Sequence, residues 1–123
     1  MAAENCCMLQ EPKTALSIIN SLIVDYEFTE REVAEMINIS VYDLKQFRVL
    51  GTLLTEETQE RLFKIRNIII TWLHDTVTHI GISQWFRSSL RNLDGKRPID
   101  LLKNGESTLV FVAASAFADG SYI

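Results

Sequence analysis

Apolar side chains recur at helical spacing along most of the chain. Between residues 13 and 24, Leu16, Ile19 and Ile23 share one side of an expected amphipathic helix. A longer helix is predicted from Thr55 to about residue 77, because its apolar positions keep the same spacing: Leu62, Ile65, Ile69, Trp72 and Leu73. Glycines fall between such stretches and mark their ends. The pattern therefore predicts helices joined by short turns.

Residues that favour helix starts precede several of these stretches. Thr29 and Glu32 have the spacing of a capping box, in which each side chain accepts a hydrogen bond from the other residue's backbone amide. Asn38 tolerates the left-handed backbone of a tight turn, and Ser40 is the expected cap of the following helix, which should end near Gly51. These signals predict one short helix after Thr29 and another after Ser40.

Three more helices are predicted in the last third of the chain. Ser83 is expected to begin the first, while Pro98 opens the second and Gly105 closes it. The apolar run 109–113 is also typical of a strand, because it is continuous and rich in β-branched residues. Alanines at positions 113, 114, 116 and 118 favour a helix over 107–119 instead. The predicted fold is all-α, with seven helices.

The last of these helices is expected to be apolar on every side. Leu109, Val112 and Phe117 lie on one stripe, and Val110 and Phe111 belong to the remaining surface. A helix of this kind is either fully buried or partly reserved for another chain. Complete burial of a terminal helix is hard to arrange in 123 residues, so a protein–protein interface is the favoured interpretation.

Composition and charge narrow the function classes. A chain of 123 residues with 47% hydrophobic side chains has the size and balance of a single globular unit. Its longest apolar run is too short to cross a bilayer and no secretory signal is evident, so a cytoplasmic protein is expected. The adjacent Cys6 and Cys7 suggest neither a disulfide framework nor a zinc site. The net charge of −4 argues against strong binding to nucleic acid by this chain alone.

Patterns typical of catalysis or metal binding are missing from the sequence. His74 and His79 are five positions apart and have no cysteine or paired carboxylate at ligand spacing. No glycine-rich phosphate loop or Gly-x-Ser-x-Gly elbow occurs, and Asp94 and Asp100 are interpreted as loop and cap residues. We therefore expect no enzymatic activity, no metal and no cofactor.

Residues 30–49 have the spacing of a helix-turn-helix. Ala34 would allow the two helices to cross closely, Asn38 would form the turn, and Leu44 would lock the second helix onto the first. Any tight helical hairpin shows the same pattern, and the acidic first helix opposes contact with DNA. In a DNA complex, the glutamine and arginine of the second helix would read base edges and its lysine would hold a phosphate. The candidate DNA-binding residues are Ser40, Tyr42, Lys45, Gln46 and Arg48.

The order of motifs after this pair of helices resembles a known protein family. Leu54-Thr55-Glu56-Glu57 opens the long helix, Trp85 follows, and the chain then reads Gly95-Lys96-Arg97-Pro98-Ile99-Asp100-Leu101-Leu102. Together with Gly120 near the end, these motifs resemble the Xre/MbcA/ParS family of antitoxins over roughly residues 14–123. The corresponding division is a loosely ordered N-terminus (1–12), an Xre-like helix-turn-helix domain (13–80) and a toxin-binding domain (81–123).

The resemblance implies a function that the composition does not show. Such antitoxins neutralise an NAD-consuming toxin of the RES-domain type by blocking its active site, form homodimers and repress their own operon. The residues implied for toxin binding are Trp85, Arg97, Leu101, Leu102, Ser121, Tyr122 and Ile123. A second hypothesis stays open from the residues themselves: a helix-turn-helix transcription regulator whose C-terminal half serves for dimerisation and binds no toxin.

Overall fold

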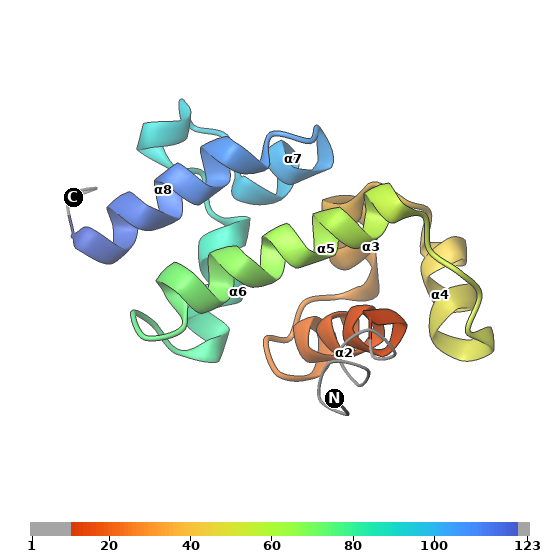
Figure 1. Ribbon diagram of the computed structural model, residues 1–123. Helices are drawn as coiled ribbons and strands as arrows, with labels where there is room; N and C mark the ends of the chain where they lie inside the picture. Colours follow the sequence, from red (N-terminus) through yellow and green to blue (C-terminus); the bar gives the residue numbers. More distant parts are fainter. Residues whose placement is uncertain (1–10, 121–123) are drawn as a thin grey trace, which may run out of the picture.

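The described part of the chain, residues 11–120 of the computed structural model, consists of helices and short connections (Figure 1). The all-α prediction is confirmed, as are seven α-helices within this range. None of them is long and apolar enough to cross a membrane. The expectations for residues 1–10, including Cys6 and Cys7, and for residues 121–123 lie outside the described residues. The α-helices are α2 (Glu11–Val24), α3 (Glu30–Ile37), α4 (Val41–Leu50), α5 (Glu56–Ile68), α6 (His79–Arg87), α7 (Pro98–Lys103) and α8 (Ser107–Asp119).

The predicted caps at the start of α3 and α4 are confirmed. The Thr29 hydroxyl accepts from the Glu32 amide at 3.1 Å, and the Glu32 carboxylate accepts from the Thr29 amide at 2.9 Å. Asn38 adopts the left-handed conformation (φ 59°, ψ 49°) that ends α3, and the Ser40 hydroxyl accepts from the Asp43 amide at 3.0 Å. Local hydrogen bonds therefore set the ends of both helices.

The prediction of one uninterrupted helix from Thr55 to about residue 77 is wrong. The α-helix α5 ends at Ile68 and continues as a π-helical segment, Ile69–Leu73, in which the His74 amide donates to the Ile69 carbonyl at 2.7 Å. A π-turn holds one more residue than an α-turn and shifts the side chains that follow it. Ile68, Ile69 and Leu73 are all buried in the core.

The predicted start of α6 at Ser83 is also wrong. The helix begins at His79, because the Thr78 hydroxyl accepts from the Gly81 amide at 3.0 Å and caps it. Ser83 lies buried inside the helix, where its hydroxyl donates to the Ile80 carbonyl at 2.9 Å. The predictions for the last two helices are confirmed: Pro98 is the first residue of α7, and α8 spans Ser107–Asp119. The strand alternative for 109–113 is excluded.

The helices surround one continuous apolar core that draws on both predicted domains. Helix α5 runs through the middle, with α2 packed on one side and α8 on the other (Figure 1). Helix α3 packs against α7, so the N-terminal helices contact the C-terminal ones directly. Helix α4 contacts mainly α3 and lies at the end of the molecule away from α8 (Figure 1).

An ion pair joins α3 to α6 across the core boundary. The Arg87 guanidinium donates to both carboxylate oxygens of Glu32, at 2.6 and 2.9 Å, and to the Glu27 carbonyl at 2.9 Å. It also lies 5.6 Å from the centre of the Phe28 ring. The hydrogen bonds from Arg87 lower the pKa of Glu32 below its ordinary value, against the opposing effect of partial burial. The pair therefore stabilises the ionised carboxylate in the folded chain.

We expect Glu32→Gln to lower the free energy of unfolding at neutral pH by about 2 kcal/mol, the usual value of a charge-assisted hydrogen bond. Because the pKa of Glu32 is lowered in the folded chain, the Glu32–Arg87 pair stabilises the fold fully at any pH above the ordinary glutamate pKa of about 4.3. This stabilisation is lost as the pH falls through the lowered pKa of Glu32. Urea unfolding between pH 3 and 7 should therefore show the free energies of unfolding of the variant and of the unaltered chain becoming equal in acid. A difference in free energy of unfolding that stays the same from pH 3 to pH 7 would contradict this role of Glu32.

Candidate functional site

Helix α8 covers the core with one side only. Val110, Ala113 and Ala114 are buried, whereas Leu109 is 47% exposed and Val112 is 58% exposed. The two exposed residues are three positions apart, so they share the side of the helix that faces away from α5 and α7. Burial of this helix is therefore incomplete, and a large apolar area of it faces water.

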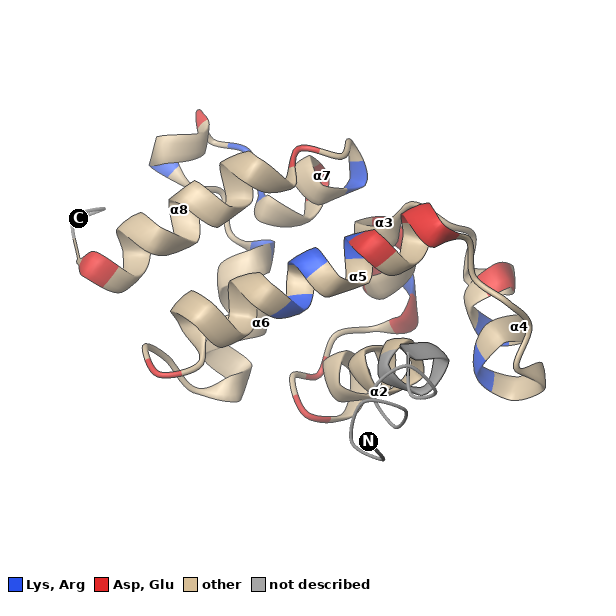
Figure 2. Cartoon of the chain, in the orientation of Figure 1, with Lys and Arg blue, Asp and Glu red and all other residues tan. Residues whose placement is uncertain are grey.

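No charge interrupts this exposed side over most of its length. In Figure 2, α8 carries no Lys, Arg, Asp or Glu until Asp119 at its C-terminal end. An uncharged apolar face exposed on a folded chain is typical of a surface that another protein covers. Contact with another protein would remove water from the apolar side chains of α8 only, and no charged group would have to be desolvated.

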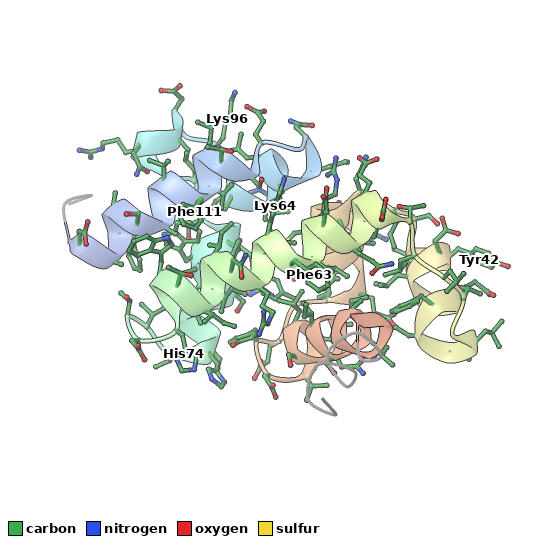
Figure 3. All side chains as sticks on the ribbon, viewed as in Figure 1. Tyr42, Phe63, Lys64, His74, Lys96 and Phe111 are labelled. Atoms are coloured by element: carbon green, nitrogen blue, oxygen red, sulfur yellow. The ribbon has the colours of Figure 1, made fainter. Side chains whose placement is uncertain are left out.

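An aromatic pair extends the apolar area toward the π-helical segment. The ring of Phe111, which is 38% exposed, meets the Trp72 ring edge-on with 5.6 Å between their centres. Beside Phe111, labelled with Lys64 in Figure 3, a groove of about 230 Å³ lies between α5 and α8. The Trp72 indole N–H is buried and has no hydrogen-bond acceptor among the described residues. We call Leu109, Phe111, Val112 and Trp72 the α8 surface.

Three of the residues implied for toxin binding are buried in the core. Trp85 is 5% exposed, and its ring packs against Phe86 and Phe117 with centres 5.2 and 6.0 Å apart. Leu101 and Leu102 of α7 are likewise in the core. Side chains buried in this way hold α6, α7 and α8 together and are not accessible to a partner in the free chain. Nothing in the sequence pattern separates this role from direct contact.

Arg97 is the exposed member of the implied set in the described chain. Its guanidinium donates to both oxygens of Asp100 at 3.0 and 2.9 Å, which raises the pKa of Arg97 and lowers that of Asp100. With 42% of its side chain exposed, Arg97 remains accessible at the start of α7. The tail candidates Ser121, Tyr122 and Ile123 lie outside the described residues.

A contact that sequence reasoning missed fixes α7 in place. The Arg61 guanidinium of α5 donates to the Leu102 carbonyl at 3.0 Å and approaches the Lys103 carbonyl at 3.4 Å. The Leu102 carbonyl at the end of α7 also accepts from the Gly105 amide at 3.0 Å, and Arg61 adds a second donor from 41 positions away. No local pattern in the sequence signals this contact, because Arg61 and Leu102 are 41 positions apart.

The candidate DNA-binding residues on α4 are partly used within the chain. Arg48 donates to the Glu30 carboxylate at 2.6 Å and to Asn20 at 3.3 Å, and Lys45 lies 3.9 Å from Glu30. Ser40 caps the helix, Tyr42 is exposed and Gln46 is half-buried. The helix is placed as predicted, but both of its cations face an acidic residue. That arrangement weakens their attraction for phosphate.

The two histidines lie near each other at the start of α6 and just before it. The rings of His74 and His79 are 6.5 Å apart, and His79 stacks edge-on against Tyr26 at 4.9 Å. Within residues 11–120, no group of three or more histidine, cysteine or carboxylate side chains is placed to hold a metal ion.

The sequence and the fold were each compared with those of known proteins. The sequence matches no protein-family model. It is 34% identical over 95 residues to the probable mycobacterial cidal antitoxin Rv3188 of Mycobacterium tuberculosis, a match that covers 77% of this chain and 80% of that protein. The fold is similar to a chain of the crystal structure of the M. tuberculosis MbcT–MbcA toxin–antitoxin complex, with a TM-score of 0.70 and 20% identity over 88% of this chain and 96% of that one. By the extent of its identity to the Rv3188 antitoxin, this chain belongs to the family of MbcA-like antitoxins.

Proposed function

We propose that this antitoxin neutralises a cognate NAD-consuming RES-domain toxin by binding it through residues 81–123 and occluding its active site. The observation that carries the proposal is the α8 surface, an uncharged apolar area left open by a chain of an antitoxin family. The fold shared with a chain of a toxin–antitoxin complex supports a toxin as the partner. Inhibition by coverage needs no catalytic group on the antitoxin.

The α8 surface has the composition of the centre of a protein–protein interface. The centre of an interface is more apolar than its rim, is enriched in aromatic side chains and holds few charged ones. Completing the burial of Leu109, Phe111 and Val112 would contribute on the order of 1 kcal/mol each, because each is about half exposed in the free chain. Arg97, accessible at the start of α7, would add a polar contact at the edge.

Co-expression tests this function directly. The product of the neighbouring reading frame should stop growth when expressed alone, and this chain should restore growth and co-purify with it. The released product should consume NAD, and adding this chain should stop that consumption. A neighbouring product that is harmless, or that this chain does not retain, would contradict the proposal.

Removal of Ser121–Ile123 is expected to weaken neutralisation, because the resemblance assigns this tail to the toxin contact. Terminal residues rarely hold a core together, so the truncated chain should keep its melting temperature within a few degrees. Growth rescue and toxin retention should be measured beside thermal unfolding of the same sample. Full protection by the truncated chain would show that the tail has no role.

The charges of this chain do not favour the operon repression that the resemblance also implies. Lys45 and Arg48 both face Glu30, and the chain carries a net charge of −4. Neither observation favours contact with a phosphate backbone.

A further inference from the structure

A pocket of about 270 Å³ lies between α2 and the junction of α5 with the π-helical segment. We call it the α2–α5 pocket. Helix α2 packs on one side of α5 and α8 on the other (Figure 1), and no residue of the α8 surface lines the pocket. Its volume is just below the roughly 300–1,000 Å³ of most small-molecule sites. A π-turn is rare in proteins and is often found at functional sites. The α2–α5 pocket therefore has room for a small organic molecule.

One part of the pocket wall is apolar. Ile18 and Leu22 lie one helical turn apart on α2, and both side chains are buried. Ile69 of the π-helical segment is buried as well, whereas Ile70 is 51% exposed and continues the apolar lining to the surface of the molecule. A hydrocarbon group that lies against these four side chains would leave water, which favours binding.

Four polar side chains complete the lining. Ser17 and Ser21 come from α2, Tyr26 from the connection that follows it, and Arg66 from α5. None of these four side chains makes a hydrogen bond or an ion pair within the described chain. Arg66 is the only charged residue among the described residues that line the pocket. The pocket therefore presents one unpaired cation beside three hydroxyl groups.

The phenol of Tyr26 is a hydrogen-bond donor at neutral pH. Burial raises the pKa of Tyr26, and the neighbouring Asp25 carboxylate, which does not line the pocket, raises it further. The His79 ring contacts the Tyr26 ring edge-on, with 4.9 Å between their centres. A protonated phenol, a guanidinium and two serine hydroxyls can all donate to the same acceptor. An anion is the acceptor that such a group of donors fits best.

We propose that the α2–α5 pocket binds a small carboxylate with an apolar body, such as a saturated acid of about eight carbons. The planar guanidinium of Arg66 can donate to both carboxylate oxygens at once. The hydroxyls of the pocket supply further donors, and the carbon chain lies against the isoleucines and Leu22. An inorganic anion would leave the apolar wall uncovered, and an alcohol would leave Arg66 without a counter-charge.

Titration of the full chain with octanoate, followed by the backbone amide shifts in proton–nitrogen NMR spectra, tests this proposal. We expect saturable shifts in α2 and in the π-helical segment, with a dissociation constant on the order of 1 mM for so small a ligand. Acetate lacks the apolar body and 1-octanol lacks the charge. Each should therefore bind at least about tenfold more weakly than octanoate.

Two variants of the pocket sharpen the test. Arg66→Gln should weaken octanoate binding at least about tenfold, because it removes the only charge in the described lining. Arg66 is exposed and unpaired within the described chain, so the variant should remain folded by circular dichroism. Ile70→Glu should also prevent binding, because its carboxylate would repel the ligand and attract Arg66 from four positions away. Lys64→Gln is the matched control, since Lys64 is an exposed cation of α5 that does not line the pocket.

The proposal would be overturned by the absence of saturable shifts up to about 10 mM octanoate. An unchanged affinity in Arg66→Gln, or an equal loss in Lys64→Gln, would also overturn it, because Arg66 would then have no specific role. Shifts confined to α8 that Val112→Glu removes would place octanoate on the α8 surface instead. All of these measurements use the free chain, so their outcome is independent of toxin neutralisation.

Discussion

Leu109→Glu combined with Val112→Glu is expected to abolish neutralisation of the toxin while the chain stays folded. Both side chains are about half exposed on the free chain, so glutamates there remain in water until a partner covers them. In the complex, the carboxylates would be taken out of water without a partner charge, at a cost of several kcal/mol. A loss of about 3 kcal/mol or more corresponds to at least a 100-fold weaker complex.

Growth rescue, retention of the toxin and thermal unfolding should be measured on the same double variant. Ile80→Glu is the matched control, because Ile80 is 49% exposed on α6 and lies outside the α8 surface. The control should protect as the unaltered chain does. Normal protection by the double variant, with toxin still retained, would remove α8 from the interface.

Trp85→Ala is expected to lower the free energy of unfolding by about 3–5 kcal/mol, the usual cost of removing a large aromatic side chain from a core. The indole is 5% exposed and packs against Phe86 of α6 and Phe117 of α8. Its loss would leave a cavity between two helices that the proposed interface requires in position. For a chain of this size, the melting temperature should fall by roughly 10–20 °C.

The stability and the toxin binding of two Trp85 variants together distinguish a core residue from a residue that touches the toxin. Trp85→Phe keeps most of the apolar volume and should recover much of the lost stability. Trp85→Ala should lose neutralisation as it unfolds and regain it at temperatures where it is folded. If Trp85→Ala melted like the unaltered chain and still failed to bind toxin, Trp85 would be a contact residue instead of a core residue.

Features with a local cause were predictable from the sequence. The Thr29–Glu32 capping box, the left-handed turn at Asn38 and the Ser40 cap each depend on residues within a few positions of one another. The bounds of α8 also followed from composition, since alanines outweigh the β-branched run. Where two capping residues compete, local reasoning fails: Thr78 and Ser83 both suit a helix start, and only the structure shows that Thr78 is used.

Features that depend on packing were not predictable in this way. The π-turn at Ile69–Leu73 leaves no mark on the apolar pattern, because residues 62, 65, 69, 72 and 73 keep the spacing of a regular helix through it. The bond from Arg61 to the end of α7 joins residues 41 positions apart. For α8, the sequence indicated an excess of apolar surface but not which side the fold leaves open, because every side is apolar.

The central claim is that the open side of α8 contacts the toxin, and photo-crosslinking from that side tests it most directly. A photoreactive amino acid placed at Val112 of the full chain should, on irradiation, form a covalent adduct with the co-expressed toxin. The same probe at Val24, which is 69% exposed against 58% for Val112 and lies on α2, should form none. A crosslink from Val24 and none from Val112, in a complex that still neutralises the toxin, would contradict the account.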